Sequence, residues 1–496
     1  MFYLYHRLGI QSNVVVAARY ASTEPGEQRL ILSEDAVFTA LHTVVTANPE
    51  LGLVGVVKPE ETGTHLLSLA ALHTVDLESC VEFIDNDDQK LDAEFFENLH
   101  SQWLWADGKV KPGVPWWKVI ILGRRDVVFL FHHLVCDGAF GMTFHREFLA
   151  ALNAAALSDT KLQNSRKVEL KPQELALDKS LQDTITRKPP VFGVIYNLLK
   201  FLFFRSFYSK KLFFGNFPKP KALLKSPLAV AQAHDRTVTK VTTYRIPAEK
   251  TDAIIAACRA HGTTLTPLLI VMIAGTLATD FYPKAEVGFT RYAVDMRATG
   301  CFESSSTGGG KLLNLAASIP EPEWLKKYRR AFPPLPVAGE KSRKNGTVDP
   351  KAAWKLVQDY GRRMKDTRAG GESSQLYKAW ISGNALGPTL EEFVDKSLPS
   401  MGFFMQNTFS VSNVGALKPA SSSPAAQDPV VKIEDVQFSA GPIQGGAGYH
   451  GIVFNVAGVA GGDTVINACA EEGMAPEGMS RAVLDGVMAR IDALLQ

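Results

Sequence analysis

The segment from Trp116 to Leu152 constrains the fold most, because it joins two apolar strands and a helix through short connections. WKVIIL (117–122) and VVFLFH (127–132) are runs of β-branched, aromatic and other apolar side chains, a composition typical of buried strands. Residues 123–126 leave room only for a tight turn, and 141–152 predict a helix. Functional residues concentrate on loops that such rigid supports hold in place. We therefore expect functional residues in the loop at residues 133–140.

Strands and helices of ordinary length alternate along the rest of the chain, which favours an α/β or α+β class. Strands are predicted at 12–20, 240–246, 286–294, 311–319, 408–413, 430–438 and 451–459, and helices at 30–47, 248–261, 264–279 and about 477–495. A chain of 496 residues exceeds one ordinary domain, so we expect two. Because residues 160–235 are irregular and proline-rich, we predict an N-terminal domain at 1–180, a crossover linker at 181–235 and a C-terminal domain at 236–496.

Composition excludes several classes of function. The formal net charge is +2 and no run of Lys and Arg stands out, so we expect no nucleic-acid partner. The five cysteines form no CxxC pair and are odd in number, which predicts neither a zinc site nor a disulfide framework. Reduced thiols, and a first segment without the pattern of a signal peptide, predict a cytoplasmic protein.

The longest apolar tract, at residues 191–204, is interrupted by Asn197 and Lys200. It is shorter than the roughly 20 apolar residues that a bilayer span needs, so we expect no transmembrane helix there. Two interpretations of residues 190–217 remain. The stretch is either an interfacial helix at a lipid surface or a crossover helix packed on the second domain with its lysine stems turned outward. We favour the second because the tract is apolar nearly all round.

The loop that follows the second strand contains FHHLVCDG (131–138), whose residue types fit general base catalysis. An imidazole has a pKa near 6.5, so His133 could take a proton from a hydroxyl that attacks a carbonyl. Asp137 could orient that imidazole directly or pair with an arginine and hold the loop. Gly138 permits a tight backbone path.

Other interpretations of the same residues are open. The histidine pair could be one core and one surface residue without chemistry. A metal site of His132, His133 and Asp137 is disfavoured, because adjacent strand residues point to opposite faces. Cys136 could be a nucleophile beside a histidine, but a buried inert thiol is the more frequent outcome.

HHLVCDG resembles the HHxxxDG signature shared by chloramphenicol acetyltransferase, peptide-synthetase condensation domains, plant BAHD acyltransferases and fungal alcohol acetyltransferases. The last group fits best, because further segments resemble it in order along the chain. These segments are RLGIQSNVVVAARY (7–20), LHTVVTANPEL (41–51), PWWKVIIL (115–122), HGTTLTPLLI (261–270) and SVSNVG (410–415). The DFGWG loop of the plant enzymes is absent, which also favours the fungal group.

The resemblance implies two chloramphenicol-acetyltransferase-like domains, each a mixed sheet with helices, with a channel between them. His133, the second histidine of the motif, would be the base inside that channel, with His132 and Gly138 in supporting positions. Asp137 would be structural and would pair with an arginine of the second domain. Arg297 in VDMR is the candidate and Arg291 is its alternative; a solvated surface charge is the other interpretation of Arg297.

The same resemblance implies an acetyl-CoA:alcohol O-acetyltransferase of secondary metabolism. Ser410, Ser412 and Asn413 would line the channel near the thioester and could donate to the oxyanion, or they could belong to a polar edge strand. Lys311 is the candidate for CoA phosphates. Acetyl-CoA or another acyl-CoA would be a co-substrate rather than a bound cofactor, no metal is expected, and the protein would work as a monomer on a small lipophilic alcohol. Transfer to an amine, transfer from a carrier protein, and a non-catalytic carrier-docking module are the alternatives.

Overall fold

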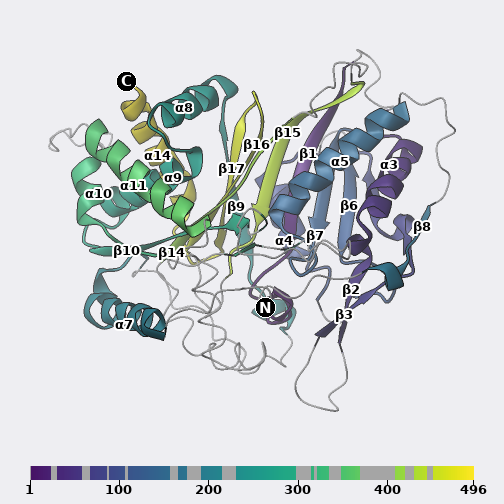
Figure 1. The fold of residues 1–496 in the computed structure, drawn as a ribbon, viewed down its shortest axis with the longest axis horizontal. Helices are drawn as coiled ribbons and strands as arrows, with labels where there is room; N and C mark the ends of the chain where they lie inside the picture. Colours follow the sequence, from purple (N-terminus) through teal and green to yellow (C-terminus); the bar gives the residue numbers. More distant parts are fainter. Residues whose placement is uncertain are drawn as a thin grey trace.

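The chain is built around two β-sheets that stand side by side (Figure 1). The computed structural model describes residues 2–23, 31–57, 67–86, 89–106, 110–156, 166–175, 191–214, 231–295, 297, 314, 316–317, 321–334, 348–368, 408–418, 429–443 and 451–496. Helices cover the sheets in both halves, so the mixed α/β class predicted from the sequence is confirmed.

The first sheet has the strand order β15-β1-β7-β6-β5. Its strands are β1 (Val14–Ser22), β5 (Val81–Ile84), β6 (Trp117–Leu122), β7 (Asp126–Phe131) and β15 (Val431–Ala440). β7 lies in the middle, antiparallel to both β1 and β6, and every residue in it is buried. Helices α3 (Glu34–Ala47) and α5 (Gly138–Ala156) pack together on one face of this sheet (Figure 1).

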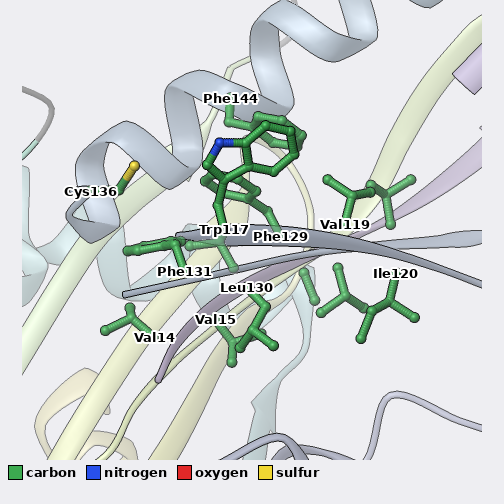
Figure 2. Close-up of a cluster of buried hydrophobic side chains, with 14 of the residues drawn as sticks. Val14, Val15, Trp117, Val119, Ile120, Phe129, Leu130, Phe131, Cys136 and Phe144 are labelled. Carbon is green, nitrogen blue, oxygen red and sulfur yellow. The ribbon is translucent and has the colours of Figure 1, made fainter. Parts of the chain in front are cut away.

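The core of this half lies between β7 and α5, and aromatic rings fill much of it (Figure 2). Phe129 of β7 stacks on Phe144 of α5 with 4.0 Å between ring centroids. Trp117 of β6 buries its ring, and its Nε1 donates to the Leu51 carbonyl at 2.7 Å. Close packing of large side chains fixes the start of α5 relative to the end of β7.

The second sheet has the order β13-β10-β14-β16-β17-β9. Its strands are β9 (Thr239–Ile246), β10 (Val287–Tyr292), β13 (Glu321–Trp324), β14 (Thr408–Leu417), β16 (Ile452–Val459) and β17 (Thr464–Glu471). β14 runs parallel to β10 and β16, whereas the remaining pairs are antiparallel. Helices α8 (Ala248–Ala260), α9 (Leu265–Thr276), α10 (Lys326–Ala331), α11 (Pro350–Arg368) and α14 (Met479–Leu495) gather on the side away from the first sheet (Figure 1).

One strand crosses from the C-terminal half into the first sheet. β15 pairs antiparallel with β1 from Val14↔Ala440 to Ser22↔Val431. Residues 431–440 fall within the predicted C-terminal domain of 236–496 but pair with the first sheet, and the predicted domain bounds stay a prediction. The local pattern of a strand does not encode such long-range pairing.

Most predicted elements lie within a few residues of the observed ones. The predicted strand at 311–319 falls mainly outside the described residues, and only β12 (Ala316–Ala317) is described, paired with β11 (Val294–Asp295). The remaining elements are α1 (Phe2–Arg7), the hairpin of β2 (Leu53–Val57) and β3 (Leu67–Ala71), the pair β4 (Thr74–Asp76) and β8 (Lys167–Glu169), and α4 (Ala93–Ser101).

Helix α7 (Val191–Tyr208) lies beside the second sheet, at the lower edge of Figure 1. Its Phe204 is buried against Phe289 of β10, while Phe192 and Phe207 are exposed. Among the described residues, no single helix is long and apolar enough to cross a membrane. The helical stretches Ala248–Ala260 and Leu265–Phe281 reach the required length and composition only when taken together, and they are bent by 99° relative to each other.

Candidate active site

The end of β7 and the start of α5 hold the histidine loop between two well-packed elements. Asp137 closes the loop, because its Oδ1 accepts the Phe140 N–H at 2.9 Å and so caps the first turn of α5. Gly138 allows a close approach of the second half of the chain. A Cβ at this position would lie 2.7 Å from Val414 Cγ1 of β14 and 3.0 Å from Phe438 of β15.

His132 has a structural environment. It is buried, its Nδ1 accepts the Leu134 N–H at 2.8 Å, and its ring lies 4.6 Å from the ring of His6 and 4.9 Å from that of Trp116. Burial, with smaller contributions from His6 and His133, holds the pKa of His132 well below its usual value. The His132 imidazole is therefore neutral and enclosed at pH 7.

His133 is oriented by the backbone of its own loop. Its Nδ1 lies 3.1 Å from the Cys136 carbonyl oxygen, which can only accept, so Nδ1 carries the proton. Nε2 is therefore left with its lone pair. The Asn314 side-chain amide donates to the His133 carbonyl and lies 3.3 Å from Nδ1, so a residue 181 positions away supports the same histidine.

A ring from the first helix covers one face of this imidazole. Phe2 of α1 stacks on His133 with 3.8 Å between ring centroids and 12° between the planes. Burial is the main reason that the pKa of His133 is lowered from its usual value, and the charge of Asp137 acts in the opposite direction. His133 is therefore neutral at pH 7, the form that can accept a proton.

Asp137 is ion-paired with an arginine from the second half of the chain. Arg297 Nη1 donates to Asp137 Oδ2 at 3.0 Å and to Oδ1 at 3.3 Å, and it also reaches Asp295 at 3.0 Å. Of the two arginines considered from the sequence, Arg297 thus forms the pair, while Arg291 lies buried in β10. This pair ties the histidine loop to the second half of the chain.

Neither a nucleophilic thiol nor a metal cluster is found in the described part of the loop. Cys136 is buried, and burial together with the charge of Asp137 raises the pKa of its thiol well above the ordinary value. A neutral buried thiol is a poor nucleophile. Among the described residues, no group of three or more His, Cys, Asp or Glu side chains is arranged to hold a metal ion.

The three polar residues predicted on β14 divide between its two faces. Val411 packs in the core of the second half and Asn413 bonds to Thr266, so Ser410 and Ser412, which alternate with them, share the opposite face of β14, the side on which Val414 meets Gly138. Asn413 points to the other side, where its Nδ2 donates to Thr266 Oγ1 at 3.0 Å. Its Oδ1 accepts the Gly415 N–H at 2.8 Å, so Asn413 orders the strand rather than facing the loop.

Two residues near His133 are not predicted by the sequence pattern. Phe2 and Asn314 come from segments far from the motif, and neither carries a local pattern that predicts such a contact. Lys311, the predicted CoA-phosphate residue, lies outside the described residues.

Sequence comparisons relate part of the chain to acetyltransferases. A family model described as alcohol acetyltransferase matches residues 73–301. A probable alcohol acetyltransferase of Aspergillus fumigatus, crmB, is 27% identical over 185 residues, covering 34% of this chain and 38% of that protein. An uncharacterized protein of Schizosaccharomyces pombe is 26% identical over 186 residues, covering 37% of this chain and 36% of that protein. The chain therefore spans little more than a third of the length of these curated relatives.

Structural comparisons extend the likeness to the whole fold. The trichothecene 15-O-acetyltransferase TRI3 of Fusarium sporotrichioides matches with a TM-score of 0.62 at 10% identity, covering 99% of this chain and 92% of that one. The epimerization domain of the tyrocidine synthetase module TycB3 gives 0.55 at 12% identity, with 100% and 94% covered. The first condensation domain of the CDA synthetase gives 0.51 at 12% identity, with 100% and 94% covered. The predicted fold of two chloramphenicol-acetyltransferase-like domains is confirmed.

Proposed function

The chain is related to the alcohol acetyltransferases through residues 73–301, and from this premise we propose that it is an acyl-CoA-dependent O-acyltransferase that transfers an acetyl group to an alcohol. The observation that carries the proposal is the hydrogen bond from His133 Nδ1 to the Cys136 carbonyl at 3.1 Å. It leaves Nε2 as a proton acceptor in a histidine whose pKa is lowered, at the position of the second histidine in the HHxxxDG motif.

In the proposed reaction, His133 Nε2 removes the proton of the acceptor hydroxyl while that oxygen attacks the thioester carbonyl. A C–O bond forms, and the carbonyl π electrons move to oxygen to give a tetrahedral oxyanion. The oxyanion then collapses, the C–S bond breaks, and the proton on Nε2 passes to the departing sulfur to give CoA and the ester. Both substrates are held together, so no acyl-enzyme is needed.

Three groups fix the base for this reaction. The Cys136 carbonyl selects the tautomer, the Phe2 ring limits rotation of the imidazole, and Asn314 holds the His133 backbone. Ser412, on the β14 face toward the loop, is the candidate oxyanion donor. One such donor is worth about 3 kcal/mol in comparable sites.

The test measures CoA released from acetyl-CoA with a thiol reagent across a panel of alcohols and amines. His133→Ala removes the base, so release should fall by about 10²- to 10⁴-fold, the usual contribution of general base catalysis. His234→Ala is the matched control, because His234 is exposed and lies outside the loop. Acceptor-dependent release from alcohols supports the proposal. Release that no acceptor stimulates, or full activity in His133→Ala, contradicts it.

A further inference from the structure

A cavity of about 300 Å³ lies between the start of α9 and the helix α11. We call it the α9–α11 cavity. Thr263, Thr264 and Thr266 line one side, and Arg362 and Lys365 line the other. Among the described residues that line it, two carry a positive charge and none is acidic. The cavity therefore favours an anion.

The first turn of α9 presents its positive end to this cavity. The helix is 12 residues long, and its N-cap residue Thr264 makes no side-chain capping bond. Pro267 has no N–H, so Leu265 and Thr266 supply the free amides of the first turn. Backbone amides at a helix N-terminus are ready donors for phosphate oxygens.

A buried hydroxyl gives an independent sign that a ligand belongs here. Thr263 is only 7% exposed, lines the cavity, and its Oγ1 has no hydrogen-bond partner. A buried hydroxyl without a partner is destabilising, and a ligand oxygen would satisfy it. On the facing helix, Gly361 leaves space around this atom, because a Cβ there would lie 3.1 Å from Thr263 Oγ1.

The two cations stand on successive turns of α11. Arg362 is ion-paired with Asp359 on the same helix and is 71% exposed, so its guanidinium can turn toward a ligand at little cost. On the other wall, His261 stacks on Trp354 at 3.9 Å, and its Nδ1 lies 2.9 Å from the Ala257 carbonyl oxygen. The lining thus combines hydroxyls, amides and cations, the donors that phosphate recognition uses.

We propose that the α9–α11 cavity binds a phosphate group of the acyl-CoA donor, an inference that rests on the proposed acyltransferase function. Its link to the histidine loop is β14. Asn413 on one face of that strand bonds to Thr266 at the cavity, and Val414 on the other face lies against Gly138. CoA carries its phosphates far from its thioester, so a site for its phosphates need not adjoin His133.

The direct test is the affinity for CoA, measured by calorimetry on the full chain. Replacing both cations in Arg362→Gln/Lys365→Gln should weaken CoA binding by about ten- to a hundredfold, the effect of losing charge-assisted hydrogen bonds. Thr263→Val should weaken binding severalfold while thermal stability stays equal or rises, because it removes an unsatisfied buried hydroxyl. Lys351→Gln, exposed on the same helix but outside the lining, is the control and should bind like the wild type.

A phosphate-free donor separates failure of this site from failure of the proposed function. The double variant should lose activity with acetyl-CoA but keep that with S-acetyl-N-acetylcysteamine. If CoA binding depends on the cavity but neither thioester is used, the site stands and the acyltransferase proposal fails. Unchanged CoA affinity in the double variant overturns the site. Inorganic phosphate that binds there without competition from CoA overturns the assignment to the donor.

A second and independent feature is the exposed aromatic face of α7. Large apolar side chains at helical spacing are open to solvent along it: Phe192 (85% exposed), Ile195, Tyr196, Leu199, Phe203 and Phe207 (72% exposed). The opposite side is anchored, because Phe204 and Tyr208 lie 5.3 and 5.2 Å from the ring of Trp324. Exposed apolar surface on this scale marks an interaction site.

Charge identifies the kind of partner. Residues 191–214 contain four basic residues and no acidic one; Lys210 is exposed just beyond the end of the helix, and Lys211 beside it is ion-paired with Glu286. An aromatic face flanked by cations fits the boundary of an anionic lipid surface. We also propose that α7 lies in the plane of such a surface and holds the protein there.

Vesicle sedimentation tests this second proposal. The wild type should bind phosphatidylserine-containing vesicles and lose binding as salt is raised, and Phe192→Ser/Phe207→Ser should reduce binding about tenfold or more. Val56→Ser/Leu69→Ser is the control, since both residues are apolar and exposed (43% and 42%) on the β2–β3 hairpin. Equal binding by the α7 variant, no binding by the wild type, or a dimer that α7 substitutions dissociate overturns the proposal.

Discussion

His133 depends on contacts that set both its tautomer and its protonation. The Cys136 carbonyl accepts from Nδ1 at 3.1 Å, so proton transfer is confined to Nε2. Phe2 and Asn314 reach the same residue from distant segments. Such contacts fix the orientation and protonation of a general base, and the effect of each can be tested separately.

The pH dependence of activity should follow the neutral form of His133. Burial lowers its pKa below the usual 6.5, so the imidazole stays a proton acceptor at neutral pH and becomes protonated only in more acid solution. We expect kcat/KM to be level from about pH 7 to 8 and to fall with a midpoint below about 6.5. The pH profile with a fixed alcohol acceptor checks this, and a midpoint above 6.5 would contradict it.

Removing the ring of Phe2 should shift that profile. Phe2→Ala admits water to the imidazole face that is now covered at 3.8 Å, so the pKa of His133 should rise toward its usual value. The acid midpoint should then move to higher pH, and kcat should fall about tenfold as the ring gains freedom. Phe2→Tyr keeps the stack and should restore the wild-type profile. A loss of activity with no change in midpoint would mean that Phe2 acts only on packing.

Breaking the Asp137–Arg297 pair should destabilise the protein, because it leaves a buried charge without its partner. Asp137 is almost fully buried, so Arg297→Ala leaves a carboxylate without its cation and should cost about 2 kcal/mol of unfolding free energy. Asp137→Asn keeps an acceptor for the Phe140 N–H, so adding it to Arg297→Ala should recover much of the loss. Urea unfolding of the two single variants and the double variant checks this; additive losses would show that the two residues do not interact.

Gly138 is the position at which β14 and β15 pack against the histidine motif. A Cβ there would meet Val414 of β14 at 2.7 Å and Phe438 of β15 at 3.0 Å. Gly138→Ala should therefore cost about 1–3 kcal/mol of stability and displace the loop that carries His133. Val414→Ala in the same chain relieves the closer of the two contacts and should restore part of the lost stability and activity. Thermal unfolding and CoA release on the two variants check it, and a single variant with wild-type behaviour would contradict it.

The sequence predicts local elements well and their assembly only in part. The strand at 117–122 agrees with β6 residue for residue, and the helix predicted at 248–261 differs from α8 by one residue. These elements follow from composition and period within a short window. The pairing of β15 with β1 joins segments about 400 positions apart, so no local pattern encodes it.

The same limit separates the site residues that were predicted from those that were missed. His133 and Asp137 share one short motif, so the sequence places them together. The pairing of Arg297 with Asp137 could be predicted only from the resemblance to a family, because the two residues are 160 positions apart. Phe2 and Asn314 have neither a motif nor a resemblance to identify them, and only the fold brings them to His133.

At the scale of the molecule, a buried polar chain connects the two sheets. His100 of α4 lies 2.9 Å from Ser12 Oγ and 2.8 Å from Ser439 Oγ of β15. Ser439 Oγ lies 3.4 Å from Cys469 Sγ of β17, and Asn455 of β16 donates to the same sulfur at 3.3 Å. Because each group occupies a fully buried position, the chain fixes the register of the sheets and makes their association sensitive to protonation.

Two buried histidines should make the folded state lose stability in mild acid. Burial lowers the pKa of both His100 and His145 to about 4, against 6.5 in the unfolded chain. Above pH 6.5 both are neutral in either state. As the pH falls from 6.5 toward 4 the unfolded chain takes up their protons and the folded protein does not. At pH 5 the two should together cost about 4 kcal/mol, and the low pKa of His132 acts in the same direction.

Urea unfolding at pH 7 and at pH 5 measures this difference, and single variants assign it. His100→Gln and His145→Gln remove a titrating group each, so the loss between the two pH values should shrink by about 2 kcal/mol in either variant, whatever the stability at pH 7. His234→Gln removes an exposed histidine and should leave the difference unchanged. If the loss between pH 7 and 5 is the same in all four proteins, these histidines are not the groups that bind the protons, and the polar chain between the sheets is not a point of acid sensitivity.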